Sequence, residues 1–577
     1  MPTLEWIGKD KVINHHQQVP YRVLEEKYTY NAEKSDNMII RGDNLEALKA
    51  LLPKYEGRIK CIYIDPPYNT GNEGWVYNDN VNDPKIRKWL GEVVGREGED
   101  LSRHDKWLCM MYPRLKLLQR LLSDDGVIFI SIDDTEYANL KTVCDEIFGS
   151  NCFVSNISWQ RTYSTRNDSK GIVNEVEHIL CYSKQPDWQP NKLPRTAEMD
   201  SKYKNPDNDY TLWRTDNAFA PGAATHQGMV YAIQHPFTGK MLYPSNGACW
   251  RYQQDTMLEI MNGWTSYELR DLNDSEERAK ICGIPVSEVR EGVQAIVLSK
   301  PLDEASADAK RILERGQWPR FFFTKGGVGG IARKTYLENV GGRLPTNFWT
   351  HSETGHTDEA KKEMLAIFDG MATFDTPKPS RLIEFILKIA ADKEALVLDS
   401  FAGSGTTAHA VLNMNKVDGG NRKFILVEMM DYADSITAER VKRVIDGYGS
   451  GKQIVEGTGG DFTFYDLGQA LLLPDGNLNE EVDTAKIREY IWYTETKTPL
   501  VEAASENPYC LGTNNNTGYY FFYEKDRITT LGYEFLATIK EKSEGYLIYA
   551  DLCTIPDEEL KRHNITFKKI PRDIARL

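Results

Sequence analysis

Short apolar runs of strand length alternate with segments of helical periodicity in two separate parts of the chain. In the first part, the expected strands are 38–40, 59–64 and 126–133, and leucine-rich helical spacing covers 45–52 and 107–122. In the second part, a helix at 380–391 precedes expected strands at 395–398 and 423–427, with another helix at 408–413 between them. Such alternation predicts parallel strands joined by crossover helices. We therefore expect one doubly wound, mostly parallel α/β sheet whose two halves are separated in the sequence.

The segments around these two parts define the expected domains. At 577 residues the chain exceeds what one hydrophobic core usually organises. Its middle is polar and aromatic, and aromatic strands follow after about residue 450. The expected domains are an N-terminal extension at 1–36, a first sheet half at 37–155, an inserted domain at 156–345, a second sheet half at 346–448 and a small C-terminal α/β domain at 449–577.

Composition argues against several classes of protein. No stretch reaches the roughly 18 uninterrupted apolar residues of a membrane-spanning helix. The N-terminus lacks a secretion signal, so we expect a cytoplasmic protein with no membrane partner. The nine cysteines are scattered and include no C-x-x-C pair, which argues against a disulfide framework or a zinc site. We expect no metal site.

One segment departs from the acidic character of the chain. The net charge is −15, yet residues 310–344 contain eight basic and only two acidic side chains. Aromatic residues are interleaved with these charges, and a glycine-rich run follows at 326–330. Basic side chains can bind phosphates, so the segment is a candidate nucleic-acid contact. A core of aromatic residues beside a solvated basic loop explains the pattern equally well. The candidate contacts are Arg320, Lys325, Arg333, Lys334 and Arg343.

A glycine-rich turn follows the first strand of the second half. Asp399 ends that strand, and the turn continues into a helix through Phe401, Gly403, Gly405 and Thr406. Glycines let a nucleotide-type ligand approach the backbone, and a helix N-terminus offers unpaired N–H groups. Glu428 ends the next strand, where such folds bind ribose hydroxyls. The alternative for the glycine turn is a tight turn whose small residues serve packing, and the alternative for Glu428 is a solvated carboxylate at a strand end. No Gly-Lys-Ser/Thr sequence occurs in the chain, so ATP is disfavoured as the ligand.

The tetrapeptide Asp65-Pro66-Pro67-Tyr68 directly follows the apolar run 59–64. A ring-conjugated amine is a poor nucleophile, and acceptors at Asp65 and the Pro66 carbonyl would localise its lone pair, while Tyr68 would stack on a flipped-out base. A methyl transfer to that amine requires positioning and electrostatics and no covalent enzyme intermediate. The alternative is a rigid turn with a helix-capping acid. No Pro-Cys dipeptide occurs, so methylation of cytosine C5 is not expected.

These motifs resemble the β-class order of the S-adenosylmethionine-dependent DNA amino-methyltransferases, with the tetrapeptide before the glycine turn. Their flanks resemble the modification (Mod) subunits of type III restriction-modification systems. The resemblance is carried by 41–48, 65–71, 126–134, 177–182, 376–379 and 399–410, and by 238–244 with 250–251 in the insert.

The resemblance implies a Rossmann-like fold with permuted motif order and a target-recognition insert. It implies transfer of a methyl group from S-adenosylmethionine to adenine N6 in double-stranded DNA. Cytosine-N4 methylation, which uses the same amine chemistry, and a non-catalytic recognition subunit are the alternatives; Asp at position 65 favours adenine. A homodimer and a partner restriction subunit with helicase and nuclease activities are also implied. The implied catalytic residues are Asp65, Pro66, Pro67 and Tyr68, and the implied cofactor contacts are Asp399, Phe401, Gly403, Gly405, Thr406, Glu428, Asp43 and Lys378.

Overall fold

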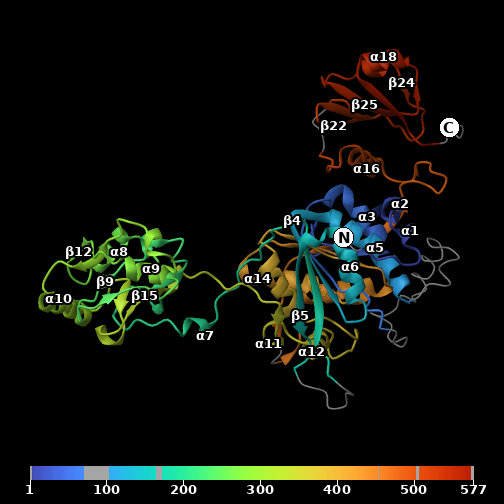
Figure 1. The fold of residues 1–577 in the computed structure, drawn as a ribbon. Coiled ribbons are helices and arrows are strands. Elements are labelled where there is room, and N and C mark those ends of the chain that lie inside the picture. The colour runs from blue at the N-terminus through green and yellow to red at the C-terminus, as the bar shows by residue number, and fades with distance from the viewer. Residues whose placement is uncertain (1–2, 71–102, 164–171, 452–453, 502–505, 573–577) are drawn as a thin grey trace. The chain divides into compact units, whose positions relative to one another are not determined.

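The computed structural model describes residues 3–70, 103–163, 172–451, 454–501 and 506–572. The chain forms two compact units (Figure 1). One unit joins residues 1–191 to residues 345–577, and the other consists of residues 192–344. No described helix is both long and apolar enough to cross a membrane.

A ten-stranded sheet forms the centre of the first unit. The six strands from β21 to β4 run parallel to one another, whereas β1 pairs antiparallel with β21, β6 pairs antiparallel with β4 and β5, and β16 pairs parallel with β5. This confirms the expected doubly wound, mostly parallel sheet. In spatial order the strands are β1 (Arg22–Tyr30), β21 (Phe462–Ala470), β2 (Met38–Arg41), β18 (Lys423–Glu428), β17 (Leu396–Asp399), β3 (Ile59–Ile64), β4 (Leu122–Ile132), β6 (Val176–Ser183), β5 (Phe153–Gln160) and β16 (Phe348–Trp349).

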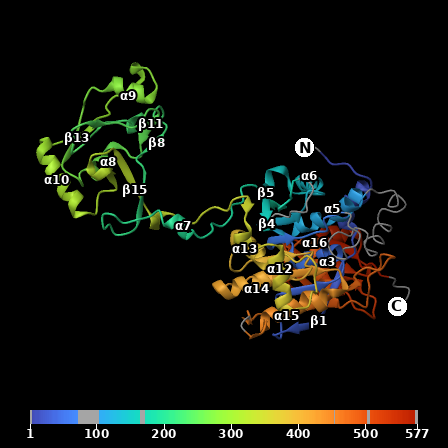
Figure 2. The ribbon, with the colours of Figure 1, turned by 90° about the horizontal axis from the view of Figure 1, so that it is seen from below.

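Helices cover both faces of this sheet, so its central strands must be apolar on both sides. Figure 2 shows α5 and α6 on one side of the sheet and α13 and α14 on the other. The helices of the described residues up to 451 that belong to this unit are α1 (Lys9–Val12), α2 (His15–Gln18), α3 (Asn44–Tyr55), α5 (Arg103–Leu121), α6 (Tyr137–Phe148), α11 (His351–Thr354), α12 (Thr357–Ile367), α13 (Ser380–Ala390), α14 (Thr406–Asp418) and α15 (Glu439–Asp446).

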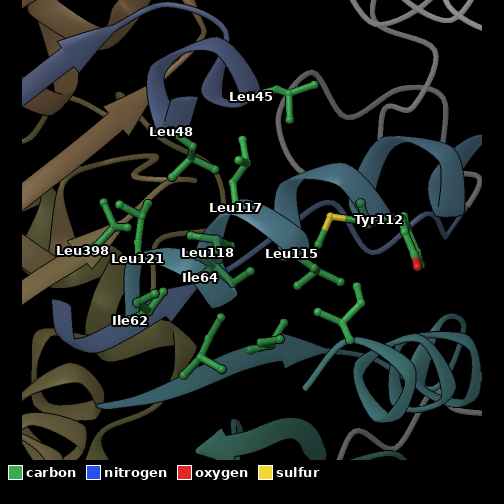
Figure 3. Packing of buried hydrophobic residues seen from close by; sticks show 14 of the residues in the cluster. Leu45, Leu48, Ile62, Ile64, Tyr112, Leu115, Leu117, Leu118, Leu121 and Leu398 are labelled. Atoms are coloured by element: carbon green, nitrogen blue, oxygen red, sulfur yellow. The ribbon is translucent and has the colours of Figure 1, made fainter. Parts of the chain in front are cut away.

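The core beneath α3 and α5 supports the strand ends that carry the conspicuous turns. Leu48 of α3 and Leu118 of α5 are fully buried together with Ile62 and Ile64 of β3 (Figure 3). Leu398 of β17 belongs to the same cluster. Burying one leucine side chain contributes about 1.5–3 kcal/mol, so this cluster fixes β3 and β17 firmly beside each other.

Three of the expected domain boundaries differ from the structure. Strand β1 lies within the expected extension at 1–36 but pairs with β21, which itself lies beyond residue 449. Most of β5 and all of β6 fall in the expected insert but belong to the central sheet, so the inserted unit begins at residue 192 rather than 156. Strands β1, β21 and β5 lie toward the sheet edges and are only partly buried. Their sequences therefore lack the continuous apolar run that identified the central strands.

The second unit, residues 192–344, has its own hydrophobic core beneath small sheets. Its strands are β7 (Trp213–Asn217), β8 (Phe219–Pro221), β9 (Ile233–Gln234), β10 (Met241–Leu242), β11 (Ala248–Trp250), β12 (Tyr267–Arg270), β13 (Ala295–Leu298), β14 (Phe321–Phe323) and β15 (Ile331–Tyr336). Its helices are α7 (Ala197–Asp200), α8 (Gln254–Met261), α9 (Ser275–Cys282) and α10 (Leu302–Arg315).

The C-terminal part builds a four-stranded sheet in the order β22-β23-β25-β27, as a small α/β fold. Helix α16 contacts the central core, where Arg120 Nη2 donates to Tyr493 Oη at 2.8 Å. The elements are β19 (Gly447–Tyr448), β20 (Val455–Glu456), α16 (Thr484–Thr496), β22 (Cys510–Asn514), β23 (Thr517–Phe521), β24 (Thr530–Leu531), α17 (Tyr533–Leu536), β25 (Gly545–Ala550), β26 (Leu552–Cys553), α18 (Asp557–Arg562) and β27 (Ile565–Lys569).

Candidate active site

The two conspicuous turns leave the sheet from adjacent strands. β3 pairs in parallel with β17, with Ile62 opposite Leu398. From this pair the chain winds outward in opposite directions, because β3 leads to its neighbour β4 and β17 leads to its neighbour β18. Open α/β sheets bind ligands at such a switch point, outside the carboxyl ends of the strands.

Buried contacts fix the turn that follows β3. Trp107 Nε1 of α5 donates to the Pro67 carbonyl at 2.7 Å, and the indole is fully buried. Asn69 adopts a left-handed conformation, with φ of 61°, and its side-chain amide donates to the Arg103 carbonyl at 3.1 Å. The two prolines further restrict the backbone. The turn is therefore rigid, and Tyr68 is held on its inner side with 9% of its surface exposed.

A lysine joins the side chains of this turn. Lys378 Nζ donates to both carboxylate oxygens of Asp65 at 2.7 Å and to Tyr68 Oη at 2.9 Å. Tyr68 Oη in turn donates to Asp65 Oδ1 at 2.9 Å. Lys378 was expected as a cofactor contact. Its side chain contacts the Asp65 turn, and residues 376–378 line one pocket with Asp65 and Asp399.

Glu177 of β6 is a member of this group that the sequence reasoning did not identify. Its Oε2 accepts from Tyr68 Oη at 3.2 Å and lies 3.7 Å from Lys378 Nζ. Its Oε1 accepts from Arg161 Nη1 at 2.8 Å. Glu177 is 7% exposed. The segment 177–182 contributed to the family resemblance, but the approach of β6 to the Asp65 turn depends on pairing with β4, which spacing alone does not reveal.

The buried charges of this group act on one another. Burial works against the charge of the Lys378 ammonium, but the carboxylates of Asp65 and Glu177 outweigh it and raise the pKa of Lys378. Burial also raises the pKa of Tyr68 well above its usual value, and the same two carboxylates raise it further. Lys378 is therefore cationic and Tyr68 is a neutral hydrogen-bond donor at physiological pH.

The glycine turn after β17 is organised around Asp399. Asp399 Oδ1 accepts from the Phe401 N–H at 3.0 Å, and its Oδ2 accepts from Thr407 Oγ1 at 2.6 Å. Burial raises the pKa of Asp399 to about 7 despite these donors. Gly405 has φ of 82°, and an added Cβ would lie 3.0 Å from the Thr437 carbonyl. Only glycine fits that position without strain.

Two of the expected cofactor contacts hold the backbone of this edge. Glu428 Oε2 accepts from the Gly403 N–H at 2.8 Å, and Oε1 accepts from the Met430 N–H at 2.9 Å. Asp43 caps α3, accepting from the Leu45 N–H at 2.8 Å. The Asp43 cap is ordinary helix N-terminus chemistry.

Sequence reasoning also missed the buried Arg440 behind the glycine turn. Arg440 Nη1 donates to the hydroxyls of Ser404 and Thr406 at 2.8 Å each, and Nη2 donates to Glu363 Oε2 at 2.9 Å. A single arginine in an amphipathic helix carries no signal of such a role. Arg440 therefore links two side chains of the glycine turn to Glu363 of α12.

One pocket joins the two turns. Its volume is about 30 Å³. Side chains and backbone from both turns line it, together with the lysine between them. The lining includes Asp65, Lys378, Asp399, Phe401, Gly403 and Thr406.

The expected nucleic-acid contacts in the second unit divide into three kinds. Arg320 and Lys325 are exposed. Arg333 Nη2 bonds to Asp216 Oδ2 at 2.6 Å, and the backbone of Arg343 pairs with Leu193. The expectation for Lys334 is wrong, because its side chain is fully buried and bonds to Asp207, Asp209 and the Trp318 carbonyl.

The aromatic residues beside these charges belong to the protein interior. Phe321, Phe322 and Phe323 of β14 are at most 5% exposed and pack in the core of the second unit. The alternative of core aromatics beside a basic loop therefore accounts for the aromatic residues.

Comparisons with known proteins agree with this geometry. The family described as DNA methylase matches residues 59–439. The chain is 32% identical over 475 residues to the type III restriction-modification enzyme StyLTI Mod subunit of Salmonella typhimurium, covering 76% of this chain and 62% of that protein. It is 29% identical over 499 residues to the EcoP15I Mod subunit of Escherichia coli, covering 77% and 66%.

A shorter relative is covered more fully. The chain is 30% identical over 398 residues to the type II methyltransferase M.KpnI of Klebsiella pneumoniae, covering 69% of this chain and 81% of that protein. By contrast, it spans less than two thirds of the length of the two Mod subunits. The family match covers both turns and the pocket between them. The chain belongs to the DNA methylase family.

Proposed function

We propose that this protein transfers a methyl group from S-adenosylmethionine to the N6 amine of a flipped-out adenine in double-stranded DNA. The observation that supports this function best is the shared pocket, whose walls carry Asp65 from one turn and the glycine turn from the other. An acceptor for the target amine and a cradle for the methyl donor must lie within bonding reach of each other.

Three features of the glycine turn fit S-adenosylmethionine. Ser400 Oγ is buried and makes no hydrogen bond within the described part of the chain, so it can serve a polar ligand. Helix α14 begins at Thr406 without a side-chain cap on its N–H groups. Gly403 and Gly405 both adopt positive φ, which keeps side chains away from the turn. A ligand with a carboxylate and hydroxyl groups matches these donors and acceptors.

Each part of the cofactor has a place in this proposal. Asp399, Phe401, Gly403, Gly405 and Thr406 would hold its methionine portion, Glu428 its ribose, and Asp43 would lie near its adenine. When bound, S-adenosylmethionine supplies an electrophilic methyl group on a sulfonium sulfur.

The turn after β3 positions the target amine. Asp65 and the Pro66 carbonyl accept its two hydrogens, so the nitrogen lone pair is localised and directed away from them. Tyr68 stacks on the base, and the bond from Trp107 to the Pro67 carbonyl keeps the turn rigid. The nitrogen would use its lone pair for the new bond to the methyl carbon, while the bond from that carbon to sulfur breaks with its electron pair left on sulfur, giving S-adenosylhomocysteine. The methylated nitrogen then loses one proton to solvent, and Asp65 accepts the hydrogen bond of that proton before it leaves.

The second unit, residues 192–344, supplies DNA recognition in this proposal. Arg320 and Lys325 are exposed and can bind phosphates, and Arg333 and Arg343 can join them. Two of the relatives are Mod subunits of type III restriction-modification enzymes by name.

We extend that role to this chain, as a cytoplasmic modification subunit that forms a homodimer and can join a restriction subunit.

The test is transfer of label from methyl-tritiated S-adenosylmethionine to DNA, followed by nucleoside analysis. The expected product is N6-methyladenine, which depends on Asp65. Recovery of N4-methylcytosine would reassign the target base. Absence of transfer to DNA that contains many sequence contexts would leave the chain as a recognition subunit only. Long-read sequencing of modified bases in cells that express the protein then gives the target sequence.

A further inference from the structure

We propose that Lys378 occupies the position of the target amine at Asp65 in the DNA-free protein, and that its ammonium moves to Glu177 when the base enters. This inference rests on the proposed function and deepens it. It makes Lys378 and Glu177 positioning residues that couple entry of the base to an exchange of ion pairs.

Lys378 Nζ makes the contact with Asp65 that an incoming amine needs. The ammonium donates to both oxygens of Asp65 at 2.7 Å and to Tyr68 Oη at 2.9 Å. It also lies 5.1 Å from the centre of the Tyr68 ring, over the surface on which a base would stack. A nitrogen with hydrogens to donate thus sits against the acceptor and the aromatic ring of the target pocket. The amine of adenine cannot bond to Asp65 until this nitrogen moves.

Glu177 offers the ammonium a second site nearby. Glu177 Oε2 is 3.7 Å from Lys378 Nζ, so a small shift of the side chain would bring the two atoms to hydrogen-bond distance. Glu177 Oε1 is held by Arg161 Nη1 at 2.8 Å, which keeps the carboxylate in place. A buried ammonium without a carboxylate partner is strongly disfavoured. The exchange keeps the ammonium of Lys378 paired because it leaves Asp65 for Glu177, and the amine of the base then takes its place as hydrogen-bond donor to Asp65.

The backbone of Lys378 is fixed, so the side chain must make this movement. Lys378 lies between Pro377 and Pro379, which restrict the backbone on both sides. Its carbonyl accepts from Thr406 Oγ1 of the glycine turn at 3.3 Å. The lysine stem is therefore anchored to the cofactor side of the pocket, while its flexible end contacts the target side.

Removal of the cation changes the charge balance of the pocket. Five titratable or charged groups surround Lys378 and its partner Asp65: Tyr63, Tyr68, Arg161, Glu177 and Asp399. Without Lys378, Arg161 is the cation that remains among these described groups, and it bonds to Glu177 rather than to Asp65. The Asp65 carboxylate, buried beside Glu177, is then harder to ionise at neutral pH. The ionised form of Asp65 then requires a higher pH.

The experiment compares Lys378→Met with Lys388→Met, a control at an exposed lysine of α13. The acid limb of the pH profile of kcat/KM should move upward by about one unit or more in Lys378→Met and stay unchanged in the control. At pH 9, with the inert cofactor analogue sinefungin, DNA affinity is measured for two duplexes that carry adenine or unsubstituted purine at the target position.

Lys378→Met should bind the adenine duplex roughly tenfold more tightly relative to the purine duplex, because only adenine has an amine that competes with the ammonium. Glu177→Gln should weaken binding of the adenine duplex alone, because the ammonium loses its second site. An unchanged affinity ratio in both variants, together with an unchanged acid limb, would overturn the exchange. If wild-type protein transfers no methyl group to DNA, the proposed function fails instead, and the two failures are thereby distinguished.

Discussion

Each compact unit contains a buried lysine between carboxylates, and the two lysines differ in what surrounds them. Lys334 in the second unit is fully buried, and its three donors meet Asp207, Asp209 and the Trp318 carbonyl. Lys378 at the edge of the large sheet is 10% exposed and lines the pocket, as does its partner Asp65. Ion pairs of the same kind therefore have different roles. Those of Lys334 stabilise the core of the second unit, whereas Lys378 lies at the proposed ligand site, where it can exchange one carboxylate partner for another.

The largest expected effect is at the pocket. Asp65→Ala should reduce kcat for methyl transfer by at least about 10³, because it removes the acceptor that localises the lone pair of the amine. Binding of S-adenosylmethionine, measured by calorimetry, should change little. Asp207→Ala is the matched change at the other lysine and should lower the melting temperature instead. Full activity in Asp65→Ala would contradict both the proposed mechanism and the difference in role between the Lys378 and Lys334 ion pairs.

The next effect is on stability in the second unit. Lys334→Met leaves Asp207 without its buried cation and should reduce the free energy of unfolding by about 3–5 kcal/mol. Urea unfolding followed by tryptophan fluorescence measures this loss, since Trp213 and Trp318 lie beside the lysine. Lys325→Met, at an exposed lysine of the same unit, should stay within about 0.5 kcal/mol of wild type. Equal stability of the two variants would contradict a structural role for Lys334.

Glycine 405 tests the cofactor side of the pocket. Gly405→Ala should weaken S-adenosylmethionine binding about tenfold, because a left-handed alanine beside the Thr437 carbonyl distorts the turn. Gly419→Ala is the control, since Gly419 ends the same helix with φ of 65° and an added Cβ meets no neighbour there. Both variants carry similar backbone strain, so only the first should lose affinity. Equal affinities in titration calorimetry would exclude the glycine turn as the cradle.

The buried acid Asp399 should make stability depend on pH. Its pKa is raised by burial to about 7 in the folded chain, against about 3.9 when unfolded. The neutral form of Asp399 therefore stabilises the folded chain fully at pH values below its pKa in the unfolded state. This stabilisation is lost as the pH rises through its pKa in the folded state. Asp399→Asn should raise the melting temperature more at pH 8 than at pH 4 in scanning fluorimetry. An equal gain in melting temperature at both pH values would contradict a raised pKa of Asp399 in the folded chain.

The smallest effects should come from the exposed basic residues. Arg320→Ala and Lys325→Ala should each weaken DNA binding a few-fold and reduce the salt dependence of log Kd by about one. Lys280→Ala, outside the basic segment, should leave that slope unchanged. Fluorescence anisotropy over a range of salt concentrations measures both quantities. Unchanged slopes in both variants would show that this surface does not contact phosphates.

Local sequence predicted the parts of the fold and site that local chemistry determines. The strands β3 and β17 were expected because fully buried strands need continuous apolar runs, and Asp65 and Gly405 were expected because their turns need unusual residues. Glu177 was missed because its approach to Asp65 depends on pairing between β6 and β4. Lys334 was misassigned because charge alone does not show burial, and only folding brings Asp207 to it.

The central claim is that one pocket brings the methyl donor to the amine acceptor Asp65. A crystal structure of the protein with S-adenosylmethionine tests this most directly. We expect the cofactor on the glycine turn, with its sulfonium methyl directed toward the Asp65 carboxylate. A cofactor seated elsewhere, with Asp65 and Lys378 outside reach of that methyl group, would contradict it.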